Sequence, residues 1–179
     1  MRWAALLRGV NVGGNRKLPM ADLKSFIEAL GFRRAQTLLA SGNVVFDADE
    51  EEGGRLESLL EREAEVRLGF RTDFLLRNGA EMEAAVAANP FEDAAAARPG
   101  TMVVIFARAL YPADLRDRIA AIYDGPERLA VDGRHLYVDF VEGQGRSKLH
   151  PALAKLRLPK AATARNWNTV TKLASMLEG

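Results

Sequence analysis

Several polar segments of the sequence combine flexible backbone with cationic side chains, the combination that binding of a small anion requires. One runs from Arg8 to Lys17, and another runs from Gly143 to Lys148. Flexible backbone can point N–H groups at an anion, and a guanidinium group offers a planar fork that matches phosphate or carboxylate. Side chains of the Ser41-Gly42-Asn43 turn can cap the backbone or contact a ligand. The residues predicted to bind the ligand are Arg8, Asn11, Gly13, Gly14, Lys17, Ser41, Asn43, Arg146, Ser147, Arg165, Asn166 and Trp167.

A third segment of this kind begins at Arg165, immediately before apolar residues at helical spacing that continue to Leu177. Asn166 is a favoured N-cap for that helix, and the free N–H groups of a first helical turn attract anions. Arg165 would add a cationic fork beside them. Trp167 fits a core anchor better than a platform on which a nucleic-acid base stacks, and both uses are compatible with the sequence.

Motifs of well-known chemistry are missing or incomplete. Gly9 and Gly14 have the separation of a P-loop, but Asn15 and Arg16 stand where that motif needs lysine and a hydroxyl residue. Asn11 stands where a dinucleotide-binding fingerprint needs its second glycine. The sequence has no cysteine and 2 histidines, too few for a zinc site of nitrogen and sulfur ligands. It therefore assigns no catalytic residue, metal or cofactor.

Charge is distributed unevenly along the chain. The 179 residues carry a net charge of +1, but residues 1–36 and 144–179 have net charges of +5 and +6, and residues 37–143 have −10. Basic ends could bind nucleic acid by counterion release, although the acidic middle would repel it unless the ends form a separate face. No apolar run approaches the roughly 20 residues of a membrane span, and no secretory signal begins the chain. We therefore expect a cytoplasmic protein without membrane association.

The hydrophobic pattern predicts the order β-α-β-β-α-β for the first half of the chain. Strands are expected at 2–10, 37–40, 44–46 and 70–77, and helices at 19–30 and 55–68. The second half is expected to follow β-α-β-β-α after a helix at 80–88 and a loose linker at 94–100. Its strands are predicted at 101–107, 128–131 and 135–140, with a helix at 112–123 and a last helix in place of a fourth strand.

Two copies of this pattern predict an α+β fold. The expected architecture is a tandem duplication of ferredoxin-like (split β-α-β) units with a C-terminal helix. The corresponding domain division is residues 1–78 and 79–179, and packing of both halves as one compact unit stays open as an alternative.

Five ordered blocks of the sequence are distinctive enough to indicate its relatives. They span residues 5–14, 19–23, 30–32, 41–46 and 165–173, and shorter blocks span 89–91 and 145–149. On these blocks the sequence resembles domain of unknown function family 1697, from the first expected strand to the last helix. The resemblance implies a soluble bacterial protein and brings no established activity, cofactor or catalytic residue. The chain departs from the family pattern at His150-Pro151, where the family more often has an uninterrupted helix start.

Three functions fit these observations. The preferred hypothesis is binding of a small anionic ligand, bearing phosphate or carboxylate, at a site built from the N-terminal Gly/Asn loop, the Ser-Gly-Asn turn and the C-terminal Arg-Asn-Trp helix start. One alternative is a nucleic-acid-binding module. The other is an enzyme that acts on an anionic substrate, using residues such as Ser41, Asn11, Arg8, Arg165 or His150. The sequence leaves the oligomeric state open.

Overall fold

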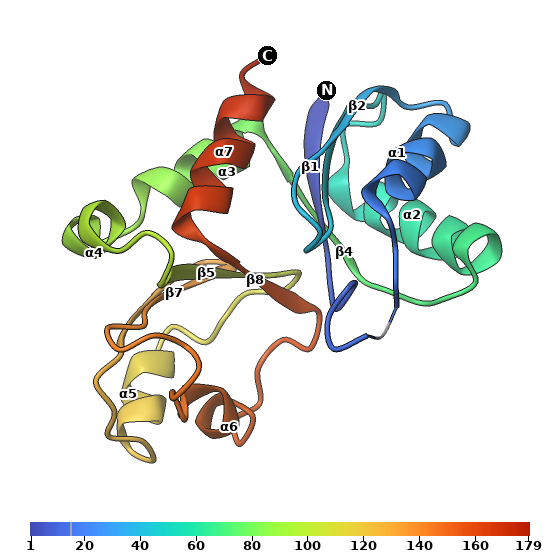
Figure 1. Cartoon of the computed structure of the whole chain (residues 1–179). Coiled ribbons are helices and arrows are strands. Elements are labelled where there is room, and N and C mark those ends of the chain that lie inside the picture. Colours follow the sequence, from blue (N-terminus) through green and yellow to red (C-terminus); the bar gives the residue numbers. More distant parts are fainter. Residues whose placement is uncertain (15) are drawn as a thin grey trace. The chain divides into compact units, whose positions relative to one another are not determined.

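The computed structural model describes residues 1–14 and 16–179. The chain forms two compact units: unit 1 consists of Met1–Ala84 and Leu173–Gly179, and unit 2 of Ala85–Lys172. Each unit contains one four-stranded antiparallel sheet (Figure 1). In the described part of the chain, no helix is long and apolar enough to cross a bilayer. The predicted domain division at residues 78 and 79 stays a prediction.

Unit 1 follows the predicted order β-α-β-β-α-β. Its elements are β1 (Arg2–Leu7), α1 (Met20–Ala29), β2 (Arg33–Thr37), β3 (Asn43–Asp47), α2 (Gly53–Leu68) and β4 (Phe74–Asn78), and the sheet order is β2-β3-β1-β4. Side chains of a strand alternate between the two faces of its sheet. On one face, Ala5 and Phe46 share a core with Ile27 of α1 and Leu60 of α2. Both helices therefore cover the same face of this sheet (Figure 1).

Unit 2 repeats this arrangement. Its sheet has the order β6-β7-β5-β8 and is built from β5 (Met102–Ala107), β6 (Arg128–Asp132), β7 (His135–Asp139) and β8 (Ala162–Asn166). Helices α5 (Leu115–Ala120) and α6 (Leu149–Leu153) contribute buried leucines to the core on one face. The remaining helices are α3 (Gly79–Ala87), α4 (Glu92–Ala97) and α7 (Trp167–Leu177). The fold is α+β with two similar halves, as expected for a tandem duplication.

Three local predictions were wrong. Residues 94–100 are not a linker, because α4 occupies Glu92–Ala97 and buries Ala94. The second half does not lack its fourth strand, because β8 pairs with β5 along its whole length. Strand β2 occupies Arg33–Thr37 and not 37–40, because its pairing with β3 ends at Thr37 and Leu39 has a left-handed φ angle of 59°.

The two halves carry the same dipeptide at the end of their last strand. Arg77-Asn78 ends β4 and Arg165-Asn166 ends β8, at matching positions of the two sheet registers. In both halves the asparagine caps the helix that follows. Asn78 Oδ1 accepts the Glu81 N–H at 2.9 Å, and Asn166 Oδ1 accepts the Thr169 N–H at 3.1 Å. This repeated Arg-Asn cap supports the duplication independently of the order of elements.

Candidate anion-binding site

The segment from Arg8 to Lys17 forms the loop between β1 and α1. The Asn11 N–H donates to the Arg16 carbonyl at 3.1 Å, which closes the loop on itself. Gly13 and Gly14 have φ angles of 59° and 77°, a region that glycine enters without the penalty that a Cβ imposes. The loop that was predicted to be flexible is therefore a turn, and its left-handed backbone conformation favours glycine at both of these positions. Asn15, which belongs to this predicted segment, lies outside the described residues.

Asn11 connects this loop to the loop that precedes β3. Its Nδ2 group donates to the carbonyls of Leu18 and Ala40 at 2.8 and 2.7 Å, and its Oδ1 accepts the Leu18 N–H at 2.7 Å. Two of the predicted segments consequently lie side by side. Because both amide hydrogens of Asn11 are used in this way, its side chain holds the two loops together.

The Ser41-Gly42-Asn43 turn is held by a buried side chain and a close approach. Asn43 is fully buried, and its Nδ2 donates to the Leu38 carbonyl at 2.7 Å and to Ser41 Oγ at 3.1 Å. A Cβ on Gly42 would lie 2.5 Å from the Val10 side chain. Glycine is therefore the residue that lets the turn pack against the end of the first loop.

An arginine-lined cavity lies on one side of the Arg8–Lys17 loop. Its volume is about 350 Å³, and its lining residues are Arg8, Arg16, Glu61, Arg62, Glu65, Arg71, Thr72 and Asp73. These residues come from the loop, from α2 and from the segment before β4. The Thr72 hydroxyl donates to the Arg8 carbonyl at 2.6 Å and the Arg8 N–H donates to the Asp73 carbonyl at 3.1 Å, so these two hydrogen bonds join two of the walls.

The cations of this cavity are only partly neutralised by its carboxylates. Arg8 pairs with Asp73 at 3.1 Å, and Arg71 pairs with Glu65 at 2.8 Å. Arg62 has one long ion pair, 3.6 Å from Glu63. The Arg16 side chain makes no hydrogen bond or ion pair with any described residue, and its Nη1 lies 3.9 Å from the position of a Cβ built on Gly9. The cavity thus offers guanidinium donors to an incoming anion.

A broader hollow lies where the loop approaches α1. It has a volume of about 420 Å³ and is lined by Asn11, Gly14, Lys17, Leu18, Pro19, Met20 and Ala40. The structure does not bring the predicted site residues of unit 1 to one cavity. Arg8 lines the first, and Asn11, Gly14 and Lys17 line the second. Gly13, Ser41 and Asn43 line neither of these two cavities.

The C-terminal predicted segment belongs to unit 2. Asn166 caps α7 through Thr169, which confirms the predicted N-cap. Arg165 is buried, and its Nη1 donates to Thr163 Oγ1 at 2.7 Å and to the Ala164 carbonyl at 2.8 Å. Burial lowers the pKa of Arg165 to about 10, so it stays a cation at neutral pH. Contact of Arg165, Asn166 and Trp167 with a ligand stays a prediction.

Arg146 and Ser147 lie on the loop before α6 and line a third cavity, of about 220 Å³, in unit 2. Ser147 Oγ donates to the Glu127 carboxylate and accepts the Leu149 N–H at 3.1 Å. This segment was a predicted site because of its glycines and cations. Glu127 was not predicted, because its hydrogen bond with Ser147 depends on how two separate loops meet.

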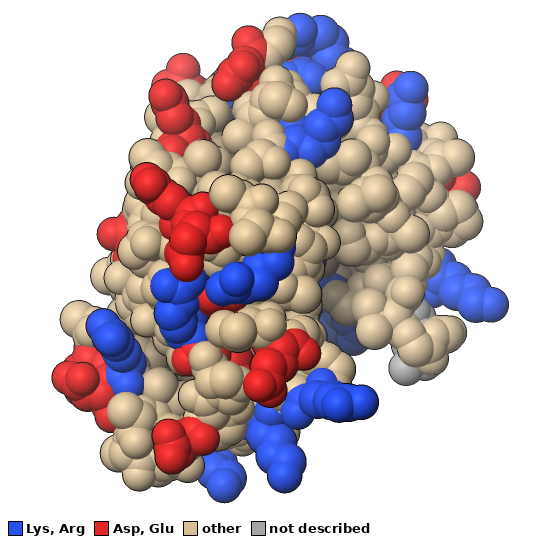
Figure 2. Space-filling view, turned by 60° about the vertical axis from the view of Figure 1, so that its left-hand side comes forward, with Lys and Arg blue, Asp and Glu red and all other residues tan. Residues whose placement is uncertain are grey.

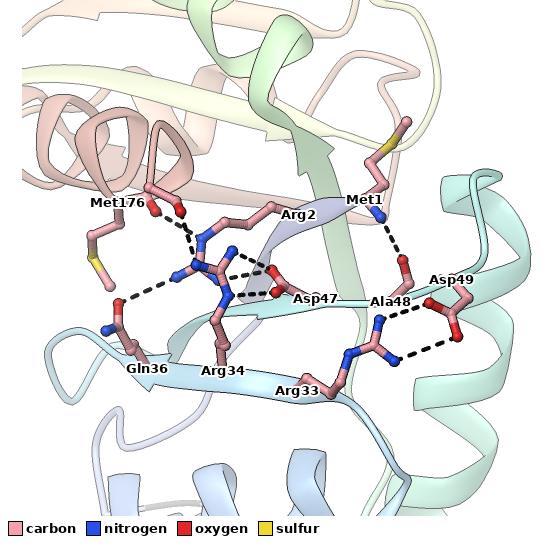
Figure 3. A network of polar contacts seen from close by, with 10 residues as sticks. Met1, Arg2, Arg33, Arg34, Gln36, Asp47, Ala48, Asp49 and Met176 are labelled. Atoms are coloured by element: carbon pink, nitrogen blue, oxygen red, sulfur yellow. Dashed lines mark hydrogen bonds and ion pairs between the residues drawn. The ribbon is translucent and has the colours of Figure 1, made fainter.

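A prominent polar network of unit 1 centres on Asp47 at the end of β3 (Figure 3). Asp47 accepts from Arg2 Nη1 at 2.8 Å and from Arg34 Nε at 2.5 Å. Hydrogen bonds from Arg34, opposed by partial burial and reinforced by those from Arg2, lower the pKa of Asp47 to about 2. Both arginines share the single carboxylate of Asp47, and the network joins strands β1, β2 and β3.

Charged residues of both signs are interspersed on the face shown in Figure 2. Lysine and arginine side chains lie there among aspartate and glutamate side chains. A nucleic-acid backbone is a regular row of phosphates and binds best along continuous positive charge. The face in this view therefore gives no particular support to nucleic-acid binding.

The amino-acid sequence matches one protein family over most of its length. The family described as Protein of unknown function (DUF1697) matches residues 1–137. The chain belongs to this DUF1697 family. This DUF1697 chain is similar in structure to the conserved bacterial protein SP0830 from Streptococcus pneumoniae, with a TM-score of 0.76 and 26% sequence identity over 99% of this chain and 98% of that one. No curated protein matches it.

Proposed function

We propose that the chain binds a small ligand bearing a phosphate or carboxylate group, and that this group lies in the arginine-lined cavity of unit 1. The observation that supports the proposal most directly is the unneutralised cation at Arg16. It lines the cavity without a carboxylate partner among the described residues, beside Arg62 with its long ion pair of 3.6 Å. A guanidinium without such a partner has donors ready for an anion, and the cavity collects them from three segments.

The predicted segments take different parts in this proposal. Arg8 lines the cavity and, although paired with Asp73 through Nη1, has further N–H donors. Asn11 and Asn43 hold the neighbouring loops in place through their side-chain hydrogen bonds. A preformed wall reduces the entropy lost when a ligand binds, which favours affinity. Nucleic-acid binding and a cytoplasmic location stay predictions from the sequence.

Titration with inorganic phosphate tests the proposal. Binding is followed by the amide NMR shifts of unit 1 at low ionic strength, where screening of exposed charges is weakest. We expect saturable shifts in the residues around the cavity. Each charge-assisted hydrogen bond contributes about 1.5–3 kcal/mol, so Arg16→Ala and Arg62→Ala should each weaken phosphate binding about tenfold or more.

Arg55→Ala is the matched control. Arg55 lies on α2, the same helix as Arg62, its side chain is 72% exposed, and its removal changes the net charge by the same amount. It does not line the cavity. Equal weakening by Arg55→Ala and Arg16→Ala would show that phosphate responds only to net charge, and shifts that never saturate would also contradict the proposal. A parallel titration with acetate separates preference for phosphate from preference for carboxylate.

A further inference from the structure

Two loops of unit 2 line the third cavity, which has a volume of about 220 Å³. None of its lining residues lines the arginine-lined cavity. One loop lies between α5 and β6 and carries Tyr123 and Glu127, and the other follows β7 and carries Arg146, Ser147 and Lys148. All five residues line the cavity. The proposed anion site in unit 1 does not use any of them.

A hydroxyl, a carboxylate and a second hydroxyl form a continuous chain of hydrogen bonds in this cavity. Ser147 Oγ donates to Glu127 Oε1, and the Tyr123 hydroxyl donates to Glu127 Oε2 at 2.7 Å. Ser147 Oγ also accepts the Leu149 N–H at 3.1 Å, which fixes the position of the hydroxyl oxygen. A Cβ on Gly125 would lie 2.2 Å from the Tyr123 hydroxyl, so a glycine at this position allows the phenol to reach Glu127.

Hydrogen bonds keep the Glu127 carboxylate ionised. Burial raises its pKa, but hydrogen bonds from Ser147, Tyr123 and the backbone, together with the nearby His150, outweigh burial, and the net shift is downward. Burial and the neighbouring Glu127 raise the pKa of Tyr123, so its hydroxyl keeps its proton. The other charged or titratable groups around this pair are His150 of α6 and the cavity residues Asp124, Glu142, Arg146 and Lys148. Neither Arg146 nor Lys148 forms an ion pair with another described residue.

A nucleophile, a base within hydrogen-bond distance and a group that orients the base are three of the geometric requirements of covalent catalysis by serine. We propose that Ser147 is a nucleophile with Glu127 as its base and Tyr123 as a positioning residue, acting on a small ester that bears a second, anionic group. Arg146 and Lys148 would bind that anionic group, because they are the cations of the cavity. This activity is independent of anion binding in unit 1.

The reaction balances without any co-reactant except water. Ser147 Oγ attacks the ester carbonyl carbon while Glu127 takes the hydroxyl proton. The bond from that carbon to the leaving oxygen breaks, and Glu127 returns the proton to the departing alcohol. Water then attacks the serine ester, Glu127 takes a proton from it, and the proton returns to Ser147 Oγ as the carboxylic acid leaves.

Phenylmethanesulfonyl fluoride tests the nucleophile on the full chain. The Ser147 oxygen would displace fluoride from sulfur, and the modified peptide is measured by mass spectrometry after digestion. We expect the label to accumulate on Ser147 at least tenfold faster than on Ser58, an exposed serine whose hydroxyl donates to the Gly54 carbonyl at 3.0 Å. Equal labelling of the two serines, or none on Ser147, would overturn the proposal.

Two variants separate chemistry from folding. Glu127→Gln keeps an acceptor for Ser147 but removes the base, so labelling of Ser147 should fall at least tenfold while thermal unfolding stays within a few degrees. Undiminished labelling in a folded Glu127→Gln protein would refute Glu127 as the base. Tyr123→Phe removes a donor that lowers the pKa of Glu127, so the acid limb of the labelling rate should move to higher pH. An unmoved pH profile would refute the positioning role of Tyr123.

Discussion

Asp47 shows how one carboxylate can hold three strands of unit 1. It pairs with Arg2 of β1 and Arg34 of β2 at 2.8 and 2.5 Å. Asp47→Asn should lower the free energy of unfolding by about 1–2 kcal/mol at pH 7, because one unit of pKa shift corresponds to about 1.4 kcal/mol and solvent around Arg34 screens part of it. Urea denaturation of both proteins measures the difference. Asp49→Asn, which disrupts the exposed pair with Arg33, should have a smaller effect.

The lowered pKa of Asp47 predicts how the free energy of unfolding depends on pH. The folded-state pKa of Asp47, about 2, lies below its ordinary value of 3.8. The stabilisation is therefore present above about pH 4 and is lost as the pH falls from about 4 toward 2, where the folded-state carboxylate gains its proton. The stability difference between wild type and Asp47→Asn should be largest near neutral pH and shrink across that window. A difference that stays constant down to about pH 2 would contradict this origin.

At the level of secondary-structure elements, the start of α7 depends on Asn166. Its Oδ1 accepts the Thr169 N–H at 3.1 Å and the Thr169 hydroxyl at 3.2 Å. Asn166→Ala leaves these donors without that acceptor and should cost about 1 kcal/mol of stability, measured by chemical denaturation. Asn166→Asp preserves an acceptor and should retain most of it. Asn168→Ala, at the exposed second residue of the helix, is the control, and an equal loss there would exclude capping as the cause.

The elements that sequence analysis predicted well are those with strong local signals. Helix α1 has apolar residues at helical spacing, and Asp132-Gly133 predicted the β6–β7 hairpin, in which Gly133 has a φ angle of 56°. Strand β8 was missed because Ala162–Asn166 has few apolar residues and ends in a helix cap. Its strand conformation comes from pairing with β5, a contact that the local sequence does not contain.

The candidate site was predictable only in part, for a similar reason. Glycine and arginine in the Arg8–Lys17 segment are local signals, and they located one wall of the cavity. Arg62 and Arg71 join it only because α2 and the approach to β4 pack beside that loop. The Arg-Asn dipeptide is repeated in the sequence at Arg77 and Arg165. This repeat would have predicted that β8 pairs with β5, as β4 pairs with β1.

At the scale of the whole molecule, unit 1 is built from two separate segments of the chain. Unit 1 consists of its first 84 residues and Leu173–Gly179. Within unit 1, Arg2 Nε donates to the Met176 carbonyl at 2.9 Å and Arg34 Nη1 donates to the Gly179 carbonyl at 2.8 Å. The C-terminal segment is therefore part of the structure that stabilises the N-terminal sheet.

Removal of residues 173–179 should destabilise unit 1. The deletion takes away both carbonyl acceptors and the buried side chains of Leu173 and Leu177, and loss of a buried leucine side chain costs about 2–5 kcal/mol. The two tryptophans report on different units, since Trp3 belongs to unit 1 and Trp167 to unit 2. In a Trp167→Phe background, the fluorescence of Trp3 should show a lower urea midpoint after the deletion. Glu178→Ala, which keeps the backbone acceptors and both leucines, should leave that midpoint in place. An unchanged Trp3 transition in the truncated chain would instead favour a first domain complete within residues 1–78.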